Sequence, residues 1–241
     1  MNIDTRKIVR VISLIVLIAS LCVLAVYIIG DLRDAKTEDD IKGLKGNDVK
    51  VPEVLDEYAG LYAENSDTIG WLKIDGMTID YVVMQAPDEI NKYLRHDFYG
   101  KDSTRGCLFV DECCDILSSD NLIIYGHNMK SGMMFRNLHD FEDRTFFDNN
   151  KYIYIYTEEE TMVYEIYAAY TANDAHILNT NDFSTELGRQ AYLETSLAKA
   201  EAGGGNVRDE VEVTSDSVII TLSTCTSRSD QRYLVQAVRI K

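Results

Sequence analysis

An uncharged apolar segment near the N-terminus constrains this chain more than any other feature of its sequence. The segment runs from Val11 to Gly30, and in a helix its twenty residues span about 30 Å, the thickness of a bilayer core. A cleaved signal peptide has a shorter apolar region and a small-residue cleavage site, which we do not find after Val26. A buried core helix is rarely apolar on every face. We therefore predict a transmembrane helix over residues 11–30.

The charged residues that flank the segment predict its orientation. Three basic residues precede it, and two acidic residues follow it with one arginine between them: Arg6, Lys7 and Arg10, then Asp31, Arg33 and Asp34. Positive charge stays on the cytoplasmic side of a membrane. We therefore expect residues 1–10 in the cytoplasm and the rest of the chain, after the span, outside the cell.

The remaining chain divides into a linker and a domain. Residues 31–50 are charged and punctuated by glycine, which is typical of a juxtamembrane linker. Residues 51–241 suit one domain with a core of its own. Apolar residues recur at helical spacing just after Pro52, so we expect this domain to begin with a helix.

Most of the domain has the pattern of short strands. A glycine turn at Asp75-Gly76 predicts a hairpin, and one long helical pattern, capped by Asp182 or Ser184, precedes the last two strands. Many short strands with one inserted helix favour a mainly β fold, a small closed barrel. The expected strands are 69–74, 77–84, 106–110, 121–125, 152–157, 162–171, 217–224 and 232–241, and the helix is 182–201.

Charge and cysteine spacing exclude several functions. The net charge of −16 makes nucleic acid an unsuitable partner. The chain has no CxxC, HxxxH or HxE spacing, so we expect no metal site. The redox state of Cys107, Cys113 and Cys114 stays open, since their spacing matches no disulfide framework.

Cys225 is the residue that most resembles a nucleophile. It is more than a hundred residues from any other cysteine, and it ends a strand in which Val218, Ile220 and Leu222 share the opposite face. A lone thiol is as often a buried structural residue. A strand end that opens into a polar loop, however, can hold a reactive atom rigidly.

A reactive thiol needs a base and a positive charge nearby. His127 alone among the four histidines follows an apolar strand, NLIIYG, as Cys225 does; the others, His96, His139 and His176, fit ordinary surface or core positions. Arg232 begins the last strand close to Cys225, whereas strand parity turns Arg239 to the other face and Arg228 lies in the turn.

These residues carry a family resemblance. TLSTC at 221–225 with Arg232 downstream, YGHNM at 125–129 and HDFYGKDSTRGCLFVD at 96–111 resemble class B sortases, which are typical of Gram-positive bacteria. The resemblance covers about 51–241 and implies the family's closed β-barrel, with an N-terminal helix and a helix inserted before the last two strands.

The resemblance also implies a reaction. Cys225 would attack a C-terminal sorting motif of an exported protein, His127 would act as acid and base, and Arg232 would stabilise the developing charge. An amine of peptidoglycan or a pilin would resolve the thioacyl enzyme without cofactor or metal. Ser223, Thr224 and Tyr125 would line the substrate groove.

Two other functions use the same sequence features. A hydrolytic membrane-anchored cysteine peptidase would have the same catalytic residues, with water resolving the thioester. A non-catalytic envelope binding protein would not need Cys225 at all. The peptidase would differ from a transpeptidase in its product, an acid in place of an amide. The binding protein would keep its function in Cys225→Ala.

Overall fold

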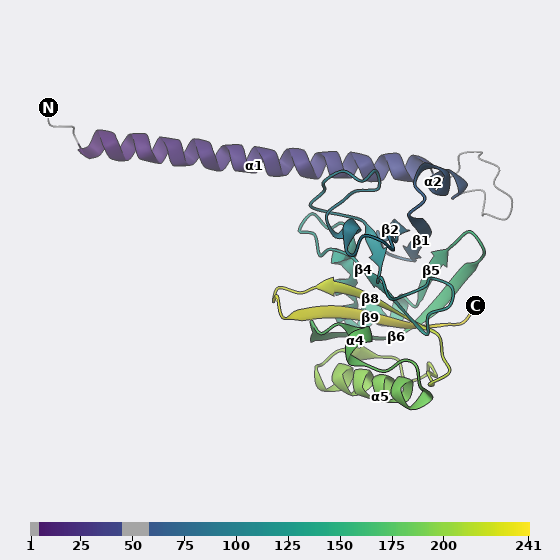
Figure 1. Cartoon of the computed structure of the whole chain (residues 1–241). Coiled ribbons are helices and arrows are strands. Elements are labelled where there is room, and N and C mark those ends of the chain that lie inside the picture. Colours follow the sequence, from purple (N-terminus) through teal and green to yellow (C-terminus); the bar gives the residue numbers. More distant parts are fainter. Residues whose placement is uncertain (1–4, 45–57) are drawn as a thin grey trace.

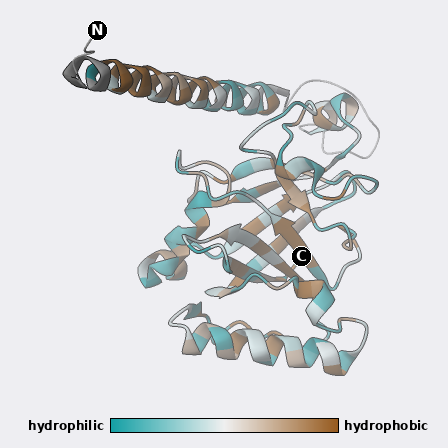
Figure 2. Ribbon diagram, turned by 60° about the vertical axis from the view of Figure 1, so that its left-hand side comes forward, coloured by the Kyte–Doolittle hydropathy of each residue, from teal (hydrophilic) through white to brown (hydrophobic). Residues whose placement is uncertain are grey.

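The computed structural model describes residues 5–44 and 58–241, and it begins with one continuous helix, α1 (Thr5–Leu44). The first part of α1 projects away from the rest of the molecule, and its side chains from residue 10 to 29 are exposed (Figure 1). The hydropathy colouring shows this projecting part as apolar (Figure 2). By length and composition, Arg10–Gly43 contains a stretch able to cross a membrane.

The segment expected to be a linker is helical as far as Leu44 and lies against the domain. Asp34, Glu38 and Ile41 are buried there, because their spacing places them on one face of the helix. The glycines do not interrupt α1, since packing against the domain outweighs their weak helix propensity. Residues 45–57, including the predicted first turn at Pro52, lie outside the described residues, and α2 (Ala59–Glu64) follows them.

Eight strands close into a barrel, as the sequence predicts. Their order is β5-β1-β2-β3-β4-β8-β9-β6, and β6 pairs with β5 to complete the ring. The two-residue β7 adds to β6 outside it. The strands are β1 (Thr68–Ile74), β2 (Asp80–Met84), β3 (Leu108–Val110), β4 (Asn121–Tyr125), β5 (Tyr152–Tyr156), β6 (Thr161–Asn173), β7 (Asn206–Val207), β8 (Ile219–Cys225) and β9 (Gln231–Arg239).

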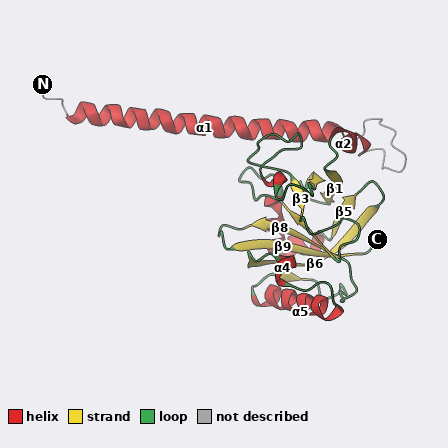
Figure 3. Cartoon of the chain, in the orientation of Figure 1, coloured by secondary structure: helices red, strands yellow, loops and turns green. Residues whose placement is uncertain are grey.

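Short helices and one long helix decorate the barrel (Figure 3). The long helix α5 begins at Glu186, capped by the Thr185 hydroxyl, which accepts a hydrogen bond from the Gly188 amide. Neither Asp182 nor Ser184 is the cap: the Asp182 carboxylate instead accepts from the hydroxyls of Ser184 and Thr185. The helices are η1 (Lys92–Leu94), η2 (Phe135–Glu142), α3 (Arg144–Asn149), α4 (Ile177–Thr180) and α5 (Glu186–Ala202).

The alternation along β8 separates the barrel core from the outer face. Ile220 and Leu222 are fully buried in the core cluster inside the barrel. Thr221, Ser223 and Cys225 point to the other face. Because β4 and β8 are parallel neighbours in the sheet, both strands end at the same edge, where the chain emerges towards solvent.

Candidate active site

The thiol of Cys225 is exposed at the end of an otherwise buried strand. Every residue of β8 before it is buried, including Ser223 and Thr224 at 4% and 2% exposure. Cys225 is a free cysteine. A rigid strand therefore presents the sulfur to solvent without requiring the backbone to open.

Arg232 lies directly across from Cys225 in the antiparallel pair of β8 and β9. Directly opposite residues put their side chains on the same face, with Cβ atoms about 5 Å apart. The guanidinium group donates to the carbonyls of Ser229 in the turn and Gln231 at the start of β9, at 3.1 and 2.9 Å. The turn thus holds a cationic group on the face that carries the thiol.

The other two arginines near the C-terminus have different partners. Arg239 lies near the far end of β9 and pairs with Glu160 at 2.6 Å. Arg228 is in the exposed turn and pairs with Asp230 at 2.7 Å. Of these three arginines, only Arg232 is in register with the cysteine.

His127 follows β4 at the level where Cys225 ends β8. Tyr125 pairs with Ser223 across the two parallel strands, so two further residues on each bring the chain to His127 and Cys225. The Nε2 atom of His127 lies 2.9 Å from the carbonyl oxygen of Leu94. Because a carbonyl only accepts, Nε2 carries the proton in this contact, and Nδ1 keeps the lone pair that can exchange a proton.

Close packing explains the glycine before His127. A Cβ atom at Gly126 would lie 2.5 Å from a Leu108 methyl group and 2.6 Å from the Phe135 ring. The Thr224 hydroxyl also donates to the Gly126 carbonyl at 2.8 Å. Tight contacts therefore hold together the strand ends that carry His127 and Cys225.

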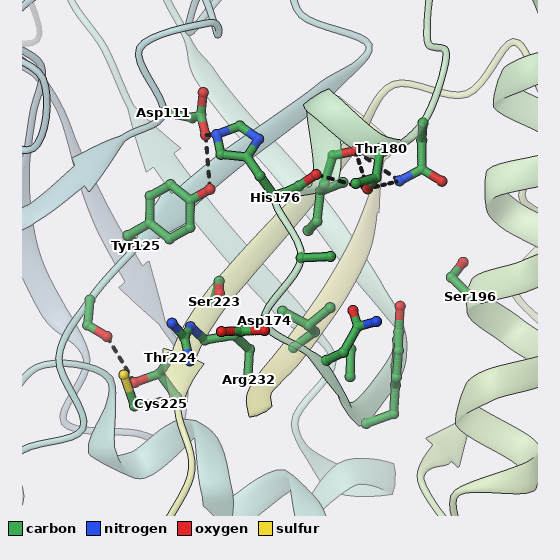
Figure 4. A pocket seen from close by; sticks show the side chains of 18 of the residues that line it. Asp111, Tyr125, Asp174, His176, Thr180, Ser196, Ser223, Thr224, Cys225 and Arg232 are labelled. Atoms are coloured by element: carbon green, nitrogen blue, oxygen red, sulfur yellow. Dashed lines mark hydrogen bonds and ion pairs between the residues drawn. The ribbon is translucent and has the colours of Figure 1, made fainter. Parts of the chain in front are cut away.

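A cavity of about 330 Å³ extends from Cys225 between the sheet and the β6–α5 connection. In Figure 4 the thiol and Arg232 lie at one end of it, and a polar cluster lies at the other. In that cluster the fully buried Asp111 accepts from the Tyr125 hydroxyl at 2.8 Å and lies 3.0 Å from His176 Nε2. Burial, followed by the charge of Asp111, raises the pKa of Tyr125, so this tyrosine remains a neutral hydrogen-bond donor.

Two histidines that the sequence assigned to ordinary positions belong to the surroundings of the site. His176 lines the cavity, and His139 Nε2 lies 3.1 Å from the Cys225 carbonyl oxygen. His96, by contrast, contacts the Lys92 carbonyl through Nδ1 at 2.8 Å. His139 lies in η2, and His176 lies three residues beyond the end of β6 in the loop before α4, so neither follows its strand as directly as His127 follows β4.

The remaining cysteines outside the apolar segment form no disulfide among the described residues. Burial raises the pKa of the Cys107 thiol and raises that of Cys114 to about 11, so both stay protonated. Donor atoms of Asp111, Glu112 and the exposed Cys113 lie within 4.8 Å of one another. The Asp111 oxygens, however, already bond Tyr125 and the Cys113 amide.

An exposed thiol, a histidine and an arginine lie at adjoining strand ends beside the cavity, an arrangement suited to acyl transfer through a cysteine on a barrel. A protein-family model of the sortase domain matches residues 72–240. The chain belongs to the sortase family. It is a cysteine transpeptidase of the type that joins surface proteins to the cell wall.

Its relatives are sortases of class B. The chain is 31% identical to sortase B of Listeria monocytogenes, over 80% of this chain and 78% of that protein. Sortase B from Bacillus anthracis in complex with AAEK1 has a TM-score of 0.77 and 27% identity, covering 89% of this chain and 99% of that one. A Staphylococcus aureus sortase B–substrate complex has a TM-score of 0.75 and 25% identity, covering 88% and 99%.

Proposed function

We propose that Cys225 is the nucleophile of this transpeptidase, His127 its acid and base, and Arg232 its electrostatic stabiliser. The observation that carries the proposal is the register of three strands. Cys225 and Arg232 are opposite each other, and His127 leaves the neighbouring parallel strand at the same level. No other cysteine among the described residues combines exposure with a register-matched arginine.

In the first half-reaction the Cys225 thiolate, whose proton has passed to Nδ1 of His127, attacks the carbonyl carbon of the scissile peptide. A carbon–sulfur bond forms, and the carbonyl electron pair moves onto oxygen, where the Arg232 guanidinium can donate to it. When the tetrahedral intermediate collapses, the carbon–nitrogen bond breaks. His127 gives a proton to the departing amine, which leaves a thioester on Cys225.

In the second half-reaction an amine attacks the thioester carbonyl. The amine transfers a proton to His127, and the carbon–sulfur bond breaks to regenerate the thiolate. The product is a new amide bond between the substrate and the acceptor. Cys225 and His127 thus return to their starting states without any other reactant.

The sorting motif would occupy the cavity that runs from Cys225 to Tyr125. Ser223 and Tyr125 line its wall on the sheet side. Thr224 also lines it, but its buried hydroxyl bonds the Gly126 carbonyl, so we assign it to holding the strand ends together. The substrate complex of the S. aureus relative supports this class of ligand.

Peptidoglycan is the acceptor we propose, with a pilin lysine as the other amine of the same chemistry. We further propose that residues 11–30 span the membrane, that residues 1–10 are cytoplasmic and that residues 51–241 form the catalytic domain outside the cell. The uncharged segment and its basic N-terminal flank support this orientation. Exported proteins and the wall would then share one compartment with Cys225.

Product analysis tests the proposal against hydrolysis. The full chain in detergent micelles is incubated with a panel of sorting-motif peptides, with and without a wall-type amine, and the products are identified by mass spectrometry. We expect an amide product that rises with amine concentration at the expense of the acid. Cleavage that yields only the acid at every amine concentration would identify a hydrolytic cysteine peptidase instead.

A further inference from the structure

We propose that Asn128, supported by His139 and Glu142, is a positioning residue that holds the backbone carbonyl of Cys225 and so fixes the nucleophile relative to His127. The inference rests on the proposed role of Cys225. It assigns to three residues outside the cavity a part in the chemistry rather than in peptide binding.

The carbonyl of Cys225 accepts a hydrogen bond from a side chain, at a point where β4 has ended and its backbone no longer pairs with β8. Ladder bonds between β4 and β8 continue as far as the Gly126 amide, which donates to the Ser223 carbonyl at 3.2 Å. In a parallel ladder the next such bond would join the Asn128 amide to the Cys225 carbonyl. The Asn128 side chain takes this place, with Nδ2 donating to Cys225 O at 2.7 Å.

A chain of hydrogen bonds orients the Asn128 amide. His139 Nδ1 lies 2.6 Å from the Glu142 carboxylate and its Nε2 lies 3.0 Å from Asn128 Nδ2. A carboxylate only accepts, so Nδ1 carries a proton. Nε2 also lies 3.1 Å from the Cys225 carbonyl oxygen, so it accepts from Asn128 when the ring is neutral and donates to that carbonyl when the ring is protonated. In both forms the Asn128 amide donates to the Cys225 carbonyl, and His139 lies against the same two groups.

Packing makes this network rigid. The His139 ring stacks on Tyr233 with a centroid distance of 4.8 Å, and its side chain is only 13% exposed. The loop that carries Asn128 is closed where the Phe135 amide donates to the His127 carbonyl at 3.0 Å. Asn128, which follows the acid–base histidine, and Cys225, which precedes the β8–β9 turn, are thereby held to one another.

The network lies outside the substrate cavity, which predicts how its loss would affect catalysis. Asn128, His139 and Glu142 are not among the residues that line the cavity, so their substitution leaves the peptide's contacts in place. The exposed turn begins immediately after Cys225, and a displacement of about 1 Å in a reacting group can cost on the order of a hundredfold in rate. Substitutions in this network should therefore lower kcat and leave KM unchanged.

Asn128→Asp tests the inference because it keeps the shape of the side chain and removes its donors. Asn137→Asp is the matched control: Asn137 lies in η2 beside His139 but donates to the Thr78 hydroxyl. With the full chain in micelles and a sorting-motif peptide, we expect Asn128→Asp to lower the acylation rate about tenfold to a hundredfold. KM and the melting temperature should match those of Asn137→Asp.

A second pair of variants tests the same network without changing Asn128. His139→Gln keeps a polar group near the position of Nε2, able to contact Asn128 and the Cys225 carbonyl, and should retain acylation within about threefold, whereas His139→Leu should lose about tenfold. Wild-type acylation rates in Asn128→Asp, or equal losses in the two His139 variants, would overturn the positioning role. Absence of acylation in the wild-type chain would instead contradict the proposed function itself.

Discussion

At the scale of single residues, its position distinguishes Arg232, the cation proposed for catalysis, from the other arginines of the turn and strand. Arg232 shares a face with the thiol through its register with Cys225, while Arg228 pairs with Asp230 in the exposed turn. We predict that Arg232→Gln lowers kcat about a hundredfold, as expected when a donor to a developing oxyanion is lost. Arg232→Lys should recover little, because a lysine lacks the planar fork of donors.

Arg228→Gln is the control for this prediction. Its ion pair with Asp230 is exposed and screened by solvent, so activity and melting temperature should remain those of the wild type. Steady-state assays with a sorting-motif peptide give kcat for both variants. Equal losses in Arg228→Gln and Arg232→Gln would show that the turn, and not Arg232, supports catalysis.

At the scale of elements, the site depends on how closely β4 approaches its neighbours. Gly126 leaves no room for a methyl group between Leu108 and Phe135. We predict that Gly126→Ala destabilises the fold by about 1–3 kcal/mol, the usual cost of an overpacked core, and also lowers activity because His127 follows directly. Chemical denaturation of the full chain in micelles measures the first effect.

Gly43→Ala is the matched substitution. Gly43 lies in α1, and a Cβ atom there would meet nothing within 4 Å, so stability should be unchanged or slightly higher. If Gly126→Ala were as stable and as active as Gly43→Ala, the proposed close approach of β4, β3 and η2 would be wrong.

Strand parity explains why so much of the barrel could be predicted from the sequence. The alternation in β8 placed Leu222 inside and Cys225 outside, and the expected strand 121–125 coincides with β4. The pairing of His139 with the Cys225 carbonyl is different in kind, since it joins residues 86 positions apart through tertiary packing. No local periodicity encodes such a contact.

At the scale of the whole molecule, α1 is docked on the domain through buried charge. Arg105 is 1% exposed, and its guanidinium donates to the Asp31 carbonyl at 3.1 Å. The Ser103 hydroxyl donates to the Asp34 carboxylate at 2.9 Å. These contacts explain why residues 31–44 form a helix on the domain: the partners come from a distant loop that the local sequence does not reveal.

Arg105→Gln should release this part of α1. The substitution removes the guanidinium that donates to the Asp31 carbonyl and faces the buried Glu38 carboxyl, so α1 should be held less tightly. We expect faster hydrogen exchange of residues 31–44 in the full chain, with the barrel amides unchanged. The exposed Arg95 offers the control, since Arg95→Gln should change hydrogen exchange neither in residues 31–44 nor in the barrel. Unchanged exchange in Arg105→Gln would contradict the docking role of Arg105.

The central claim, that Cys225 carries the acyl group, is tested most directly by locating the covalent intermediate. The full chain is mixed with a sorting-motif peptide, quenched with acid and digested, and the modified residue is identified by mass spectrometry. We predict a thioester on Cys225 that disappears on addition of an amine and never forms in Cys225→Ala, which should stay folded because the thiol is exposed. An acyl adduct on any other residue, or turnover by Cys225→Ala, would contradict the account.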